Sequence, residues 1–588
     1  MKVSDYIIRF LEKRGIKDMF YLSGGGCMHL LNSLAESERI NGVAMQHEQA
    51  VSIAMESYAF VGECPSVALV TTGPGATNAI TGALSAYIDS MPCLILSGQV
   101  KTSDLKSQYD VRALGSQEAD IVTMVKEITK YAVTVINPQD IKYCLEKAWY
   151  LMNEGRKGVV WIDVPLDVQS ADIEEDVVKG YQIPNLIETD LTNTLDELAK
   201  MIEEAKRPIL MLGNGVRSSR GLDALIDKLQ IPVIPSWKGI DMVSNTSPLY
   251  VGKCGILGDR VGNFAVQTAD FILSLGCRLD YSITGYNRSE WAPHAKKVVV
   301  EIDRAELSKL QDANISLEIN ENAQRVIDDL LARKIHHCDW EKWYALIEKW
   351  KAQYTVSDTR NDSEVISTYE LVDCIAKLSS KGSIIVPCSA GTVAEIFHQA
   401  FSVKKGQIIR SNHGLGAMGY ELPAAIGAYY ALRKPVICVA GDGGIQLNIQ
   451  ELATIAGNKL PIRIIVVNNG GYSSIRGMQR AHFNGHYFGS NEESGLYLPD
   501  MCKIASAYGL ETLQINHKCE LEEKIEYVLK SKGPILCNVN VDSSCVVALK
   551  CASRVLEDGK IISSSLEDMS PLLAETEIRE QIDSALNI

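Results

Sequence analysis

The sequence predicts an α/β fold of three doubly wound parallel-sheet domains. Short apolar strands, such as residues 66–71, 93–97 and 435–440, are almost uninterrupted hydrophobic runs, which is typical of parallel strands covered on both faces. Helical stretches such as 49–60 and 77–88 alternate with these strands, and that alternation predicts parallel sheets with helical crossovers. A chain of 588 residues is long enough for three or four domains of ordinary size.

Composition narrows the classes of function. The net charge is −15, and because nucleic acid selects for basic surfaces we expect no nucleic-acid partner. We find no basic-then-apolar leader and no run of 18 apolar residues, so no membrane partner is expected. The fifteen cysteines are scattered without CxxC pairs. This pattern indicates reduced thiols and predicts a cytoplasmic location.

The domains are expected at residues 1–169, 186–335 and 365–545, followed by a C-terminal tail at 546–588. An acidic irregular stretch near 170–190 and a polar one at 357–363 are expected to be linkers. In the second domain a strand enters the turn Gly213-Asn214-Gly215. This turn lacks the full GxGxxG pattern, so the residues leave open whether the domain binds a nucleotide or is purely structural. Just before the second linker, an apolar series at helical spacing predicts the packing face of a connecting helix: Trp340, Trp343, Leu346 and Trp350.

The third domain carries a motif that predicts a diphosphate and metal site. The strand at 435–440 runs into Gly441-Asp442-Gly443-Gly444, and the strand at 462–467 runs into Asn468-Asn469-Gly470-Gly471-Tyr472. Because open α/β sheets bind ligands at the carboxyl ends of their strands, Asp442 and the asparagines should share one edge. Oxygen ligands combined with a bound diphosphate suit Mg²⁺, and the glycines would let the backbone approach the phosphates closely.

The first domain carries a second set of candidate residues. Gln46-His47-Glu48-Gln49-Ala50 lies at the start of a helix, where a lone acid usually only complements the helix dipole. Three glycine turns also follow strands in this domain: Ser23 to Gly26, Thr71 to Asn78 and Ser97 to Val100. Because these turns are expected at the same edge of the sheet, they favour a functional role for Glu48 over a purely structural one.

Over nearly its whole length the chain resembles the acetohydroxyacid (acetolactate) synthase-like thiamine diphosphate enzymes. The matching motifs, in chain order, are the Gly-Gly-Gly turn, HEQA, TTGPGATNAITG, DSMP, SGQV, GLGAMGYELPAAIGA and GDG followed by NNGGY, with 24 residues between Gly443 and Asn468. The resemblance implies a pyrimidine-binding, a central and a diphosphate-binding domain. It also implies a homodimer or homotetramer whose active sites form at the subunit interface. Thiamine diphosphate and Mg²⁺ are the implied cofactors, and FAD, which the central domain often holds in this family, is left open.

The resemblance also assigns roles to residues of this chain. Glu48 would bind the cofactor pyrimidine and promote its activation, and Gln117 is the second catalytic candidate. The metal ligands would be Asp442, Asn469 and the carbonyl of Gly471. Met418 would bend the cofactor, and the Gly416 carbonyl would accept a hydrogen bond from its amino group. The full set of implied cofactor-binding residues is Gly391, Thr392, Gly416, Met418, Asp442, Gly443, Gly444, Asn469 and Tyr472.

The expected substrates are a 2-keto acid, with pyruvate as donor, and a carbonyl acceptor. The implied substrate residues are Gly25, Ser116, Ser474 and Met478. Several of the chain's departures from the biosynthetic members fall on acceptor contacts: Met478 replaces a Trp, Ser116 a Phe and Leu166 a Lys. In the central domain Ser282 replaces a flavin-site Arg, although Arg278 and Asp280 remain. The activation residues are intact.

The leading hypothesis is therefore an acetolactate synthase-like carboligase. One alternative keeps the activation step but uses another acceptor, such as a nucleotide-linked keto sugar in surface-polysaccharide synthesis. Simple decarboxylation is a second alternative, which the absence of adjacent histidines in the first domain disfavours. A non-catalytic structural subunit, the competing class, should have lost Glu48 or a metal ligand, and this chain retains both.

Overall fold

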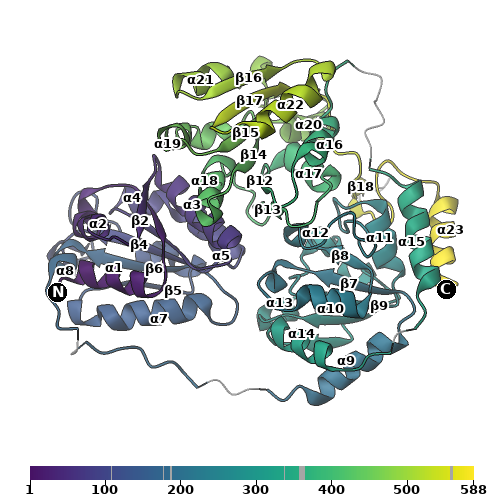
Figure 1. The fold of residues 1–588 in the computed structure, drawn as a ribbon, viewed down its shortest axis with the longest axis horizontal. Helices are drawn as coiled ribbons and strands as arrows, with labels where there is room; N and C mark the ends of the chain where they lie inside the picture. Colours follow the sequence, from purple (N-terminus) through teal and green to yellow (C-terminus); the bar gives the residue numbers. More distant parts are fainter. Residues whose placement is uncertain are drawn as a thin grey trace.

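The structure is a computed structural model that describes residues 1–106, 109–175, 178–185, 189–336, 338–356, 364–551, 553–555 and 561–588. The expected linker at 357–363 lies outside the described residues, as do parts of the one at 170–190. Three parallel sheets, each with helices on both faces, form three units along the chain (Figure 1). The predicted α/β fold of three parallel-sheet units is confirmed.

The first unit contains a six-stranded sheet in the order β2-β1-β3-β4-β6-β5, and every neighbouring pair is parallel. Its central strands are buried along their whole length, as their apolar sequences predict. The strands are β1 (Asp18–Tyr21), β2 (Asn41–Ala44), β3 (Ser66–Val70), β4 (Cys93–Gln99), β5 (Tyr131–Thr134) and β6 (Val160–Pro165). The helices are α1 (Val3–Lys13), α2 (Met28–Ala35), α3 (Glu48–Gly62), α4 (Pro74–Asn78), α5 (Ile80–Ile88), α6 (Ile121–Val125), α7 (Ile141–Asn153) and α8 (Leu166–Ser170).

The central unit contains a five-stranded parallel sheet in the order β11-β10-β9-β7-β8. Its strands are β7 (Pro208–Leu212), β8 (Val233–Pro235), β9 (Phe271–Leu275), β10 (Lys296–Val300) and β11 (Leu317–Ile319). Its helices are α9 (Thr192–Glu204), α10 (Leu222–Leu229), α11 (Arg260–Thr268), α12 (Tyr281–Thr284), α13 (Arg304–Ser308), α14 (Ala323–Ala332) and α15 (Glu341–Gln353). The predicted series from Trp340 to Trp350 is buried at α15 and packs into the core of this unit, which confirms its structural role.

The third unit repeats the topology of the first, because its strand order β13-β12-β14-β15-β17-β16 is the same pattern shifted along the chain. All of these pairs are parallel. The strands are β12 (Ile384–Val386), β13 (Ile408–Ile409), β14 (Val436–Gly441), β15 (Ile462–Asn468), β16 (Glu511–Ile515) and β17 (Ile535–Asn540). The helices are α16 (Thr368–Leu378), α17 (Gly391–Ala400), α18 (Glu421–Leu432), α19 (Glu451–Gly457), α20 (Ser473–His482), α21 (Met501–Ala507) and α22 (Leu521–Lys530).

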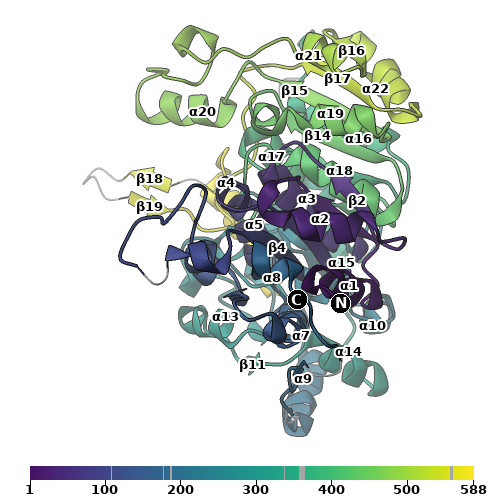
Figure 2. The same ribbon diagram turned by 90° about the vertical axis from the view of Figure 1, so that its left-hand side faces the viewer.

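The first and third units meet where α3 packs along α18 (Figure 2). The two helices approach so closely that a Cβ on Gly427 would lie 2.1 Å from the carbonyl oxygen of Ala54. Ser57 of α3 donates a hydrogen bond to the Ala424 carbonyl of α18, at 2.7 Å. Small residues at this crossing therefore set the distance between the two sheets that carry the predicted site.

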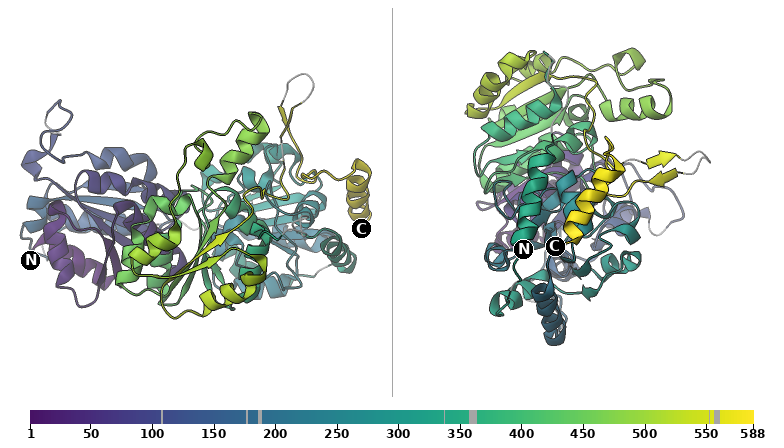
Figure 3. Two further views of the ribbon diagram at one scale, coloured as in Figure 1. Left: turned by 90° about the horizontal axis from the view of Figure 1, so that it is seen from above. Right: turned by 90° about the vertical axis from the view of Figure 1, so that its right-hand side faces the viewer.

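The C-terminal segment packs on the central unit. Helix α23 (Glu575–Leu586) lies beside α15 and α11 (Figure 3), and Trp350 donates to Gln581 at 3.0 Å. Before it, β18 (Ser553–Val555) and β19 (Ile561–Ser563) form an antiparallel hairpin. Among the described residues we find no helix with the length and apolarity needed to cross a membrane.

Candidate active site

Asp442 follows β14 at the carboxyl edge of the third sheet. Its side chain is 3% exposed, and the backbone N–H groups of Gly443 and Gly471 donate to its two oxygens at 2.8 and 2.9 Å. Burial nevertheless raises the pKa of Asp442 to about 6, against the opposing effect of these hydrogen bonds. A buried carboxylate held by backbone donors is suited to binding a cation, because a cation would compensate its desolvation.

Asn469 lies beside Asp442 at the end of the neighbouring strand β15, as the sequence predicts. Its side chain is 6% exposed, and its Nδ2 donates to Ser473 Oγ at 3.1 Å. The other side-chain atom, Oδ1, is buried and has no hydrogen-bond partner among the described residues. An unpaired buried amide oxygen costs free energy, and a metal ion at this oxygen would remove that cost. The Gly471 carbonyl, the third predicted ligand, accepts from the Ser473 N–H at 3.1 Å and keeps a second lone pair.

The other predicted cofactor-binding residues lie at the same edge of the sheet. Gly391 and Thr392 begin α17 after β12, with Gly391 at φ +75°. Gly416 (φ +67°) follows β13, and the half-buried Met418 lies two residues later. Gly443 makes room for the Tyr472 ring, because a Cβ there would lie 2.4 Å from Tyr472 Cε1. Gly444, by contrast, faces open space and begins a 3₁₀ helix, Gly444–Asn448.

Glu48 is the first residue of α3, at the carboxyl edge of the first sheet. The helix is capped by His47, whose Nδ1 accepts from the Gln49 N–H at 3.0 Å. Asn78, in the glycine turn after β3, donates to Glu48 Oε2 at 3.0 Å. The same turn brings Gly75 beside the carboxylate, since a Cβ on Gly75 would lie 3.4 Å from Oε1. Two of the predicted motifs, HEQA and TTGPGATN, thus form one local structure around Glu48.

Gln117 is positioned by the other end of this turn. A Cβ on Gly73 (φ +62°) would lie 2.5 Å from the Gln117 carbonyl oxygen, so only glycine permits this contact. Thr72 Oγ1 lies 3.3 Å from the same carbonyl and 2.9 Å from Gln99 Oε1. The backbone of Gln117 is therefore seated on the turn that holds Glu48, while its side chain is exposed.

The predicted substrate residues come from three places. Gly25 lies beside the same turn, because Gly26 N–H donates to Thr71 Oγ1 at 3.1 Å and a Cβ on Gly25 would meet no atom within 4 Å. Ser116 is exposed next to Gln117. Ser474 and Met478 lie on α20, where Ser474 Cβ is 3.7 Å from a Cβ built on Gly391 and Met478 is exposed. Gly25 and Ser116 thus belong to the first unit, whereas Ser474 and Met478 belong to the third.

Hydrogen bonds join the two halves of the site within one chain. The Gln46 N–H donates to Glu451 Oε1 at 3.1 Å, and Asn448 Nδ2 donates to Gln49 Oε1 at 3.4 Å. The start of α3 is thus fixed against the segment that follows the GDGG turn. The Glu48 carboxylate itself points back toward Asn78, whereas Asp442 is held by Gly443 and Gly471.

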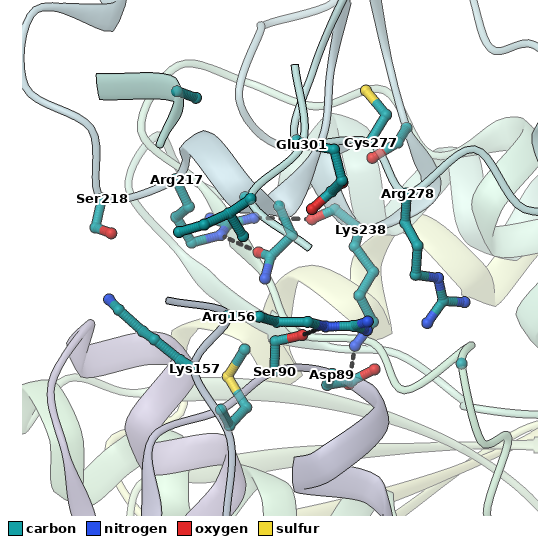
Figure 4. A pocket seen from close by; sticks show the side chains of 18 of the residues that line it. Asp89, Ser90, Arg156, Lys157, Arg217, Ser218, Lys238, Cys277, Arg278 and Glu301 are labelled. Carbon is teal, nitrogen blue, oxygen red and sulfur yellow. Dashed lines mark hydrogen bonds and ion pairs between the residues drawn. The ribbon is translucent and has the colours of Figure 1, made fainter. Parts of the chain in front are cut away.

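A cavity of about 410 Å³ lies between the central unit and its two neighbours. The segments that follow β7, β9 and β10 supply one wall, including Gly215, Cys277 and Glu301. Figure 4 shows Arg156 and Lys157 entering from the first unit, opposite Arg217, Lys238 and Arg278 of the central unit. Ligand sites of open parallel sheets lie at this edge.

Most cations around this cavity already have acidic partners. Arg156 binds Asp303 and Glu306 at 2.9 and 2.7 Å, Arg217 binds Asp241 at 2.6 Å, and Arg278 binds Asp280 at 2.7 Å. Lys238 pairs with Asp89. Ser282 lines the cavity at the position where the sequence lacks the expected flavin-site arginine, and its N–H donates to Asp280 at 3.0 Å.

Sequence reasoning missed three kinds of residue here. It did not assign Arg156 or Lys238 to the cavity, because their partners lie more than 100 residues away along the chain. It did not identify Asp163, a buried acid in a strand, where burial raises the pKa to about 7. It also overlooked Arg476, since a single arginine on a polar helix gives no signal of its contacts. Arg278 and Asp280, which the sequence analysis named beside the flavin-site position, both line the cavity.

Comparison with known proteins gives consistent matches along the chain. Residues 1–124 match the N-terminal TPP binding domain of the thiamine pyrophosphate enzymes, residues 195–330 their central domain, and residues 389–539 their C-terminal TPP binding domain. The chain is similar to the acetolactate synthase large subunit of Cyanidium caldarium, with 31% identity across 92% of this chain and 93% of that protein. Comparable relatives are acetolactate synthase isozyme 1 large subunit of Escherichia coli (29%, covering 92% and 94%) and acetolactate synthase 2, chloroplastic, of Nicotiana tabacum (30%, covering 92% and 82%).

Proposed function

The chain belongs to the acetolactate synthase-like thiamine diphosphate enzymes, and on that premise we propose that it is a carboligase. It decarboxylates a 2-keto acid, with pyruvate as the donor, and transfers the remaining acyl unit to a second carbonyl compound. The observation that carries this proposal is the pair Asp442 and Asn469 at adjacent strand ends, with Asn469 Oδ1 buried and unpaired.

These residues fit a Mg²⁺ ion. Mg²⁺ takes oxygen ligands and is usually held by one or two protein carboxylates together with substrate phosphates. The Asp442 carboxylate, the Asn469 Oδ1 and the Gly471 carbonyl would supply the protein's share. The pKa of Asp442, raised by burial, and the unpaired Asn469 oxygen both reflect a site that a cation would stabilise.

Thiamine diphosphate, when bound, supplies a carbon nucleophile and an electron sink for the decarboxylation of a 2-keto acid. In this chain Gly391, Thr392, Gly443 and Gly444 would bind its diphosphate, because the open space at Gly444 lets a phosphate approach the backbone. Gly416 and Met418 would contact its rings and hold them against each other. Tyr472 packs over Gly443 and closes the turn on its far side.

Glu48 is proposed to share a proton with the pyrimidine ring. Asn78 donates to Oε2 and so fixes that oxygen as an acceptor. Oε1, beside Gly75, is then the atom at which the carboxyl group holds and returns the proton. The capped start of α3 fixes the position of the backbone, so the carboxylate keeps one orientation.

We propose that five residues surround the keto acid and its acceptor: Gly25, Ser116, Gln117, Ser474 and Met478. The turn that orients Glu48 also contacts the Gln117 carbonyl, so the backbone of Gln117 keeps a fixed position relative to Glu48. Ser116 and Ser474 are small and polar. This leaves room for an acceptor larger than a second pyruvate, such as a keto sugar.

We also propose that two chains pair to form each active site, in a homodimer or homotetramer. The Glu48 half-site and the Asp442 half-site lie on separate units, and their carboxylates bind different partners within one chain. Exposed side chains next to the cofactor edge, including Met478 and Leu447, would be covered by the second copy.

FAD is proposed as the occupant of the interunit cavity. The strand ends that form its wall, the adjacent Gly213–Gly215 turn and the carboxylate of Glu301 suit a dinucleotide. The match is weaker at Ser282, which stands where the family has a flavin-site arginine. A purified protein with flavin absorbance that denaturation releases would support FAD, and a colourless protein that cannot be reconstituted would refute it.

Product analysis tests the proposed function. The purified chain is incubated with pyruvate alone and with pyruvate plus candidate acceptors, with and without thiamine diphosphate and Mg²⁺, and carbon dioxide and the coupled product are measured. Cofactor-dependent carbon dioxide release with a coupled product is expected. If no 2-keto acid is decarboxylated under these conditions, the proposal fails.

A further inference from the structure

Arg476, on helix α20, binds backbone carbonyls from three separate segments of the third unit. Its Nη2 donates to the carbonyls of Asn469 and Ser543 at 2.7 and 3.2 Å. Its Nη1 donates to those of Gly470 and Ser490 at 3.0 and 3.1 Å. The side chain is 6% exposed. A buried guanidinium thus satisfies four carbonyl groups at once.

Two of these carbonyls belong to the loop that carries the proposed metal ligands. Asn469 is itself a proposed ligand, and Gly470 and Gly471 follow it. Because each peptide group is planar, fixing the carbonyls of Asn469 and Gly470 also fixes the directions of the N–H groups of Gly470 and Gly471. The Gly471 N–H is the group that donates to Asp442 Oδ2. Arg476 therefore fixes the backbone of Asn469 and, through the Gly471 N–H, the hydrogen bond to Asp442.

The other two carbonyls, of Ser490 and Ser543, belong to segments outside this loop. Ser490 also accepts from the Tyr472 N–H at 2.9 Å. A Cβ on Gly471 (φ +120°) would lie 2.4 Å from the Ser490 oxygen, so the loop presses directly against that segment. Arg476 binds both the loop and this backing, and Ser543 adds the segment that follows β17. Without the guanidinium, four buried or partly buried carbonyls would lose a donor.

We propose that Arg476 is a positioning residue that preforms the metal-binding loop before Mg²⁺ and the cofactor arrive. This inference rests on the proposed function, because it takes Asp442, Asn469 and Gly471 as the ligands. Arg476 touches none of the reacting atoms. Its effect is to hold Asn469 Oδ1 and the Gly471 backbone where a cation can use them without reordering the loop.

The test compares Arg476→Met and Arg476→Lys with the control Arg480→Met. Arg480 lies one turn further along the same helix, is exposed, and donates to Tyr487 at 3.3 Å. Mg²⁺ affinity in the presence of thiamine diphosphate is measured by calorimetry on the metal-free protein. We expect Arg476→Met to weaken Mg²⁺ binding about 10- to 100-fold, the usual range for residues that orient metal ligands. Arg480→Met should match the wild type.

Arg476→Lys separates positioning from simple folding. An ammonium group has three donors and no planar fork, so it can restore some of the four contacts, and its Mg²⁺ affinity should fall between the wild type and Arg476→Met. Circular dichroism should show a folded protein for all variants. Wild-type Mg²⁺ affinity in a folded Arg476→Met protein, or the same loss in Arg480→Met, would overturn the proposal.

Hydrogen exchange of the Gly470 and Gly471 amides in the metal-free protein is the second readout and needs no cofactor. Faster exchange in Arg476→Met than in wild type or Arg480→Met is expected, because the Gly471 N–H loses its fixed direction toward Asp442. Unchanged exchange would also overturn the proposal. If the wild type itself binds neither Mg²⁺ nor thiamine diphosphate, the proposed function fails, while the exchange data still decide whether Arg476 orders the loop.

Discussion

Substituting Arg410 by Met should destabilise the contact between the first and third units. Arg410 follows β13 and is completely buried, and its Nη2 binds Glu56 of α3 and, at 3.2 Å, Asp89 at the end of α5. Both carboxylates are also buried. Methionine fills a similar volume but leaves these two acids without their shared cation.

The expected cost follows from the partners that remain. Removing one member of a buried ion pair costs about 3–5 kcal/mol, since it leaves an uncompensated charge. Glu56 keeps hydrogen bonds from Ser85 and Tyr420, at 2.9 and 2.7 Å, and Asp89 keeps Lys238. We therefore expect a loss of about 3 kcal/mol in the free energy of unfolding, at the lower end of that range.

The control is Arg433→Met, which removes another arginine that links the third unit to the first. Arg433 Nη2 binds Asp18 Oδ1 at 2.6 Å, but the Arg433 side chain is 47% exposed. Asp18 also keeps a hydrogen bond from Asn41 at 2.8 Å. Solvent reaches the Arg433 end of this pair although Asp18 is buried, so the loss of Arg433 should cost less than the loss of Arg410, about 1 kcal/mol. Urea unfolding followed by far-ultraviolet circular dichroism, at one protein concentration, measures both variants.

The pH dependence gives a second check. A buried carboxylate without a cation is relieved by taking up a proton, so the cost of Arg410→Met should be smaller near pH 5 than near pH 8. The reasoning would be refuted if Arg410→Met and Arg433→Met cost the same, or if the cost of Arg410→Met did not change with pH.

Three further predictions concern single side chains. Glu48→Gln should leave cofactor and Mg²⁺ affinity close to wild type but lower kcat with pyruvate about 10²- to 10⁴-fold, because the amide cannot return a proton; full activity in a carbon dioxide release assay would contradict the role of Glu48. Asp442→Ala should weaken Mg²⁺-dependent cofactor binding at least about tenfold by calorimetry, and unchanged affinity would exclude Asp442 as a ligand. Burial raises the pKa of Asp163 to about 7, so the folded chain holds a proton there that the unfolded chain loses near pH 4. Wild-type stability should therefore fall as the pH rises from about 5 to about 7, and Asp163→Asn should flatten this slope by up to about 1.4 kcal/mol per pH unit; an unchanged slope in urea unfolding would contradict this.

The parts of the site that lie at strand ends could be predicted from the sequence. A buried parallel strand must end in a loop at the same edge as its neighbours, so the placement of Asp442 beside Asn469 follows from the two strands that precede them. Glu48 and Asn78 are similar, because each lies in the segment that follows a strand of the first sheet. Apolar spacing was enough to identify the buried face of α15, including Trp343 and Trp350.

The interunit contacts could not be predicted in this way. The Arg410–Glu56 pair joins residues 354 positions apart, and no local pattern distinguishes either residue from a surface charge. The cavity of Figure 4 has walls from all three units, including Arg156, Arg278 and His413, so it exists only once the units are docked. Arg476 acts through backbone carbonyls, which every residue carries and which the sequence therefore cannot single out.

The repeated topology of the first and third units explains how one chain builds both halves of the site. In each unit the helix after the edge strand that opens the sheet order, β2 or β13, begins with a glutamate, Glu48 in α3 and Glu421 in α18. Glu421 is buried and accepts from the Ser389 N–H at 3.0 Å, so it fixes the loop that leads to Gly391 and Thr392. Burial raises the pKa of Glu421, which suits a structural hydrogen-bonding group. Glu48 instead accepts from Asn78 at the carboxyl edge of its sheet, where we propose that it shares a proton with a ligand. Equivalent positions thus differ in their contacts because the turns beside them differ. The close packing of α3 on α18 at Gly427 fixes the distance between the two helices.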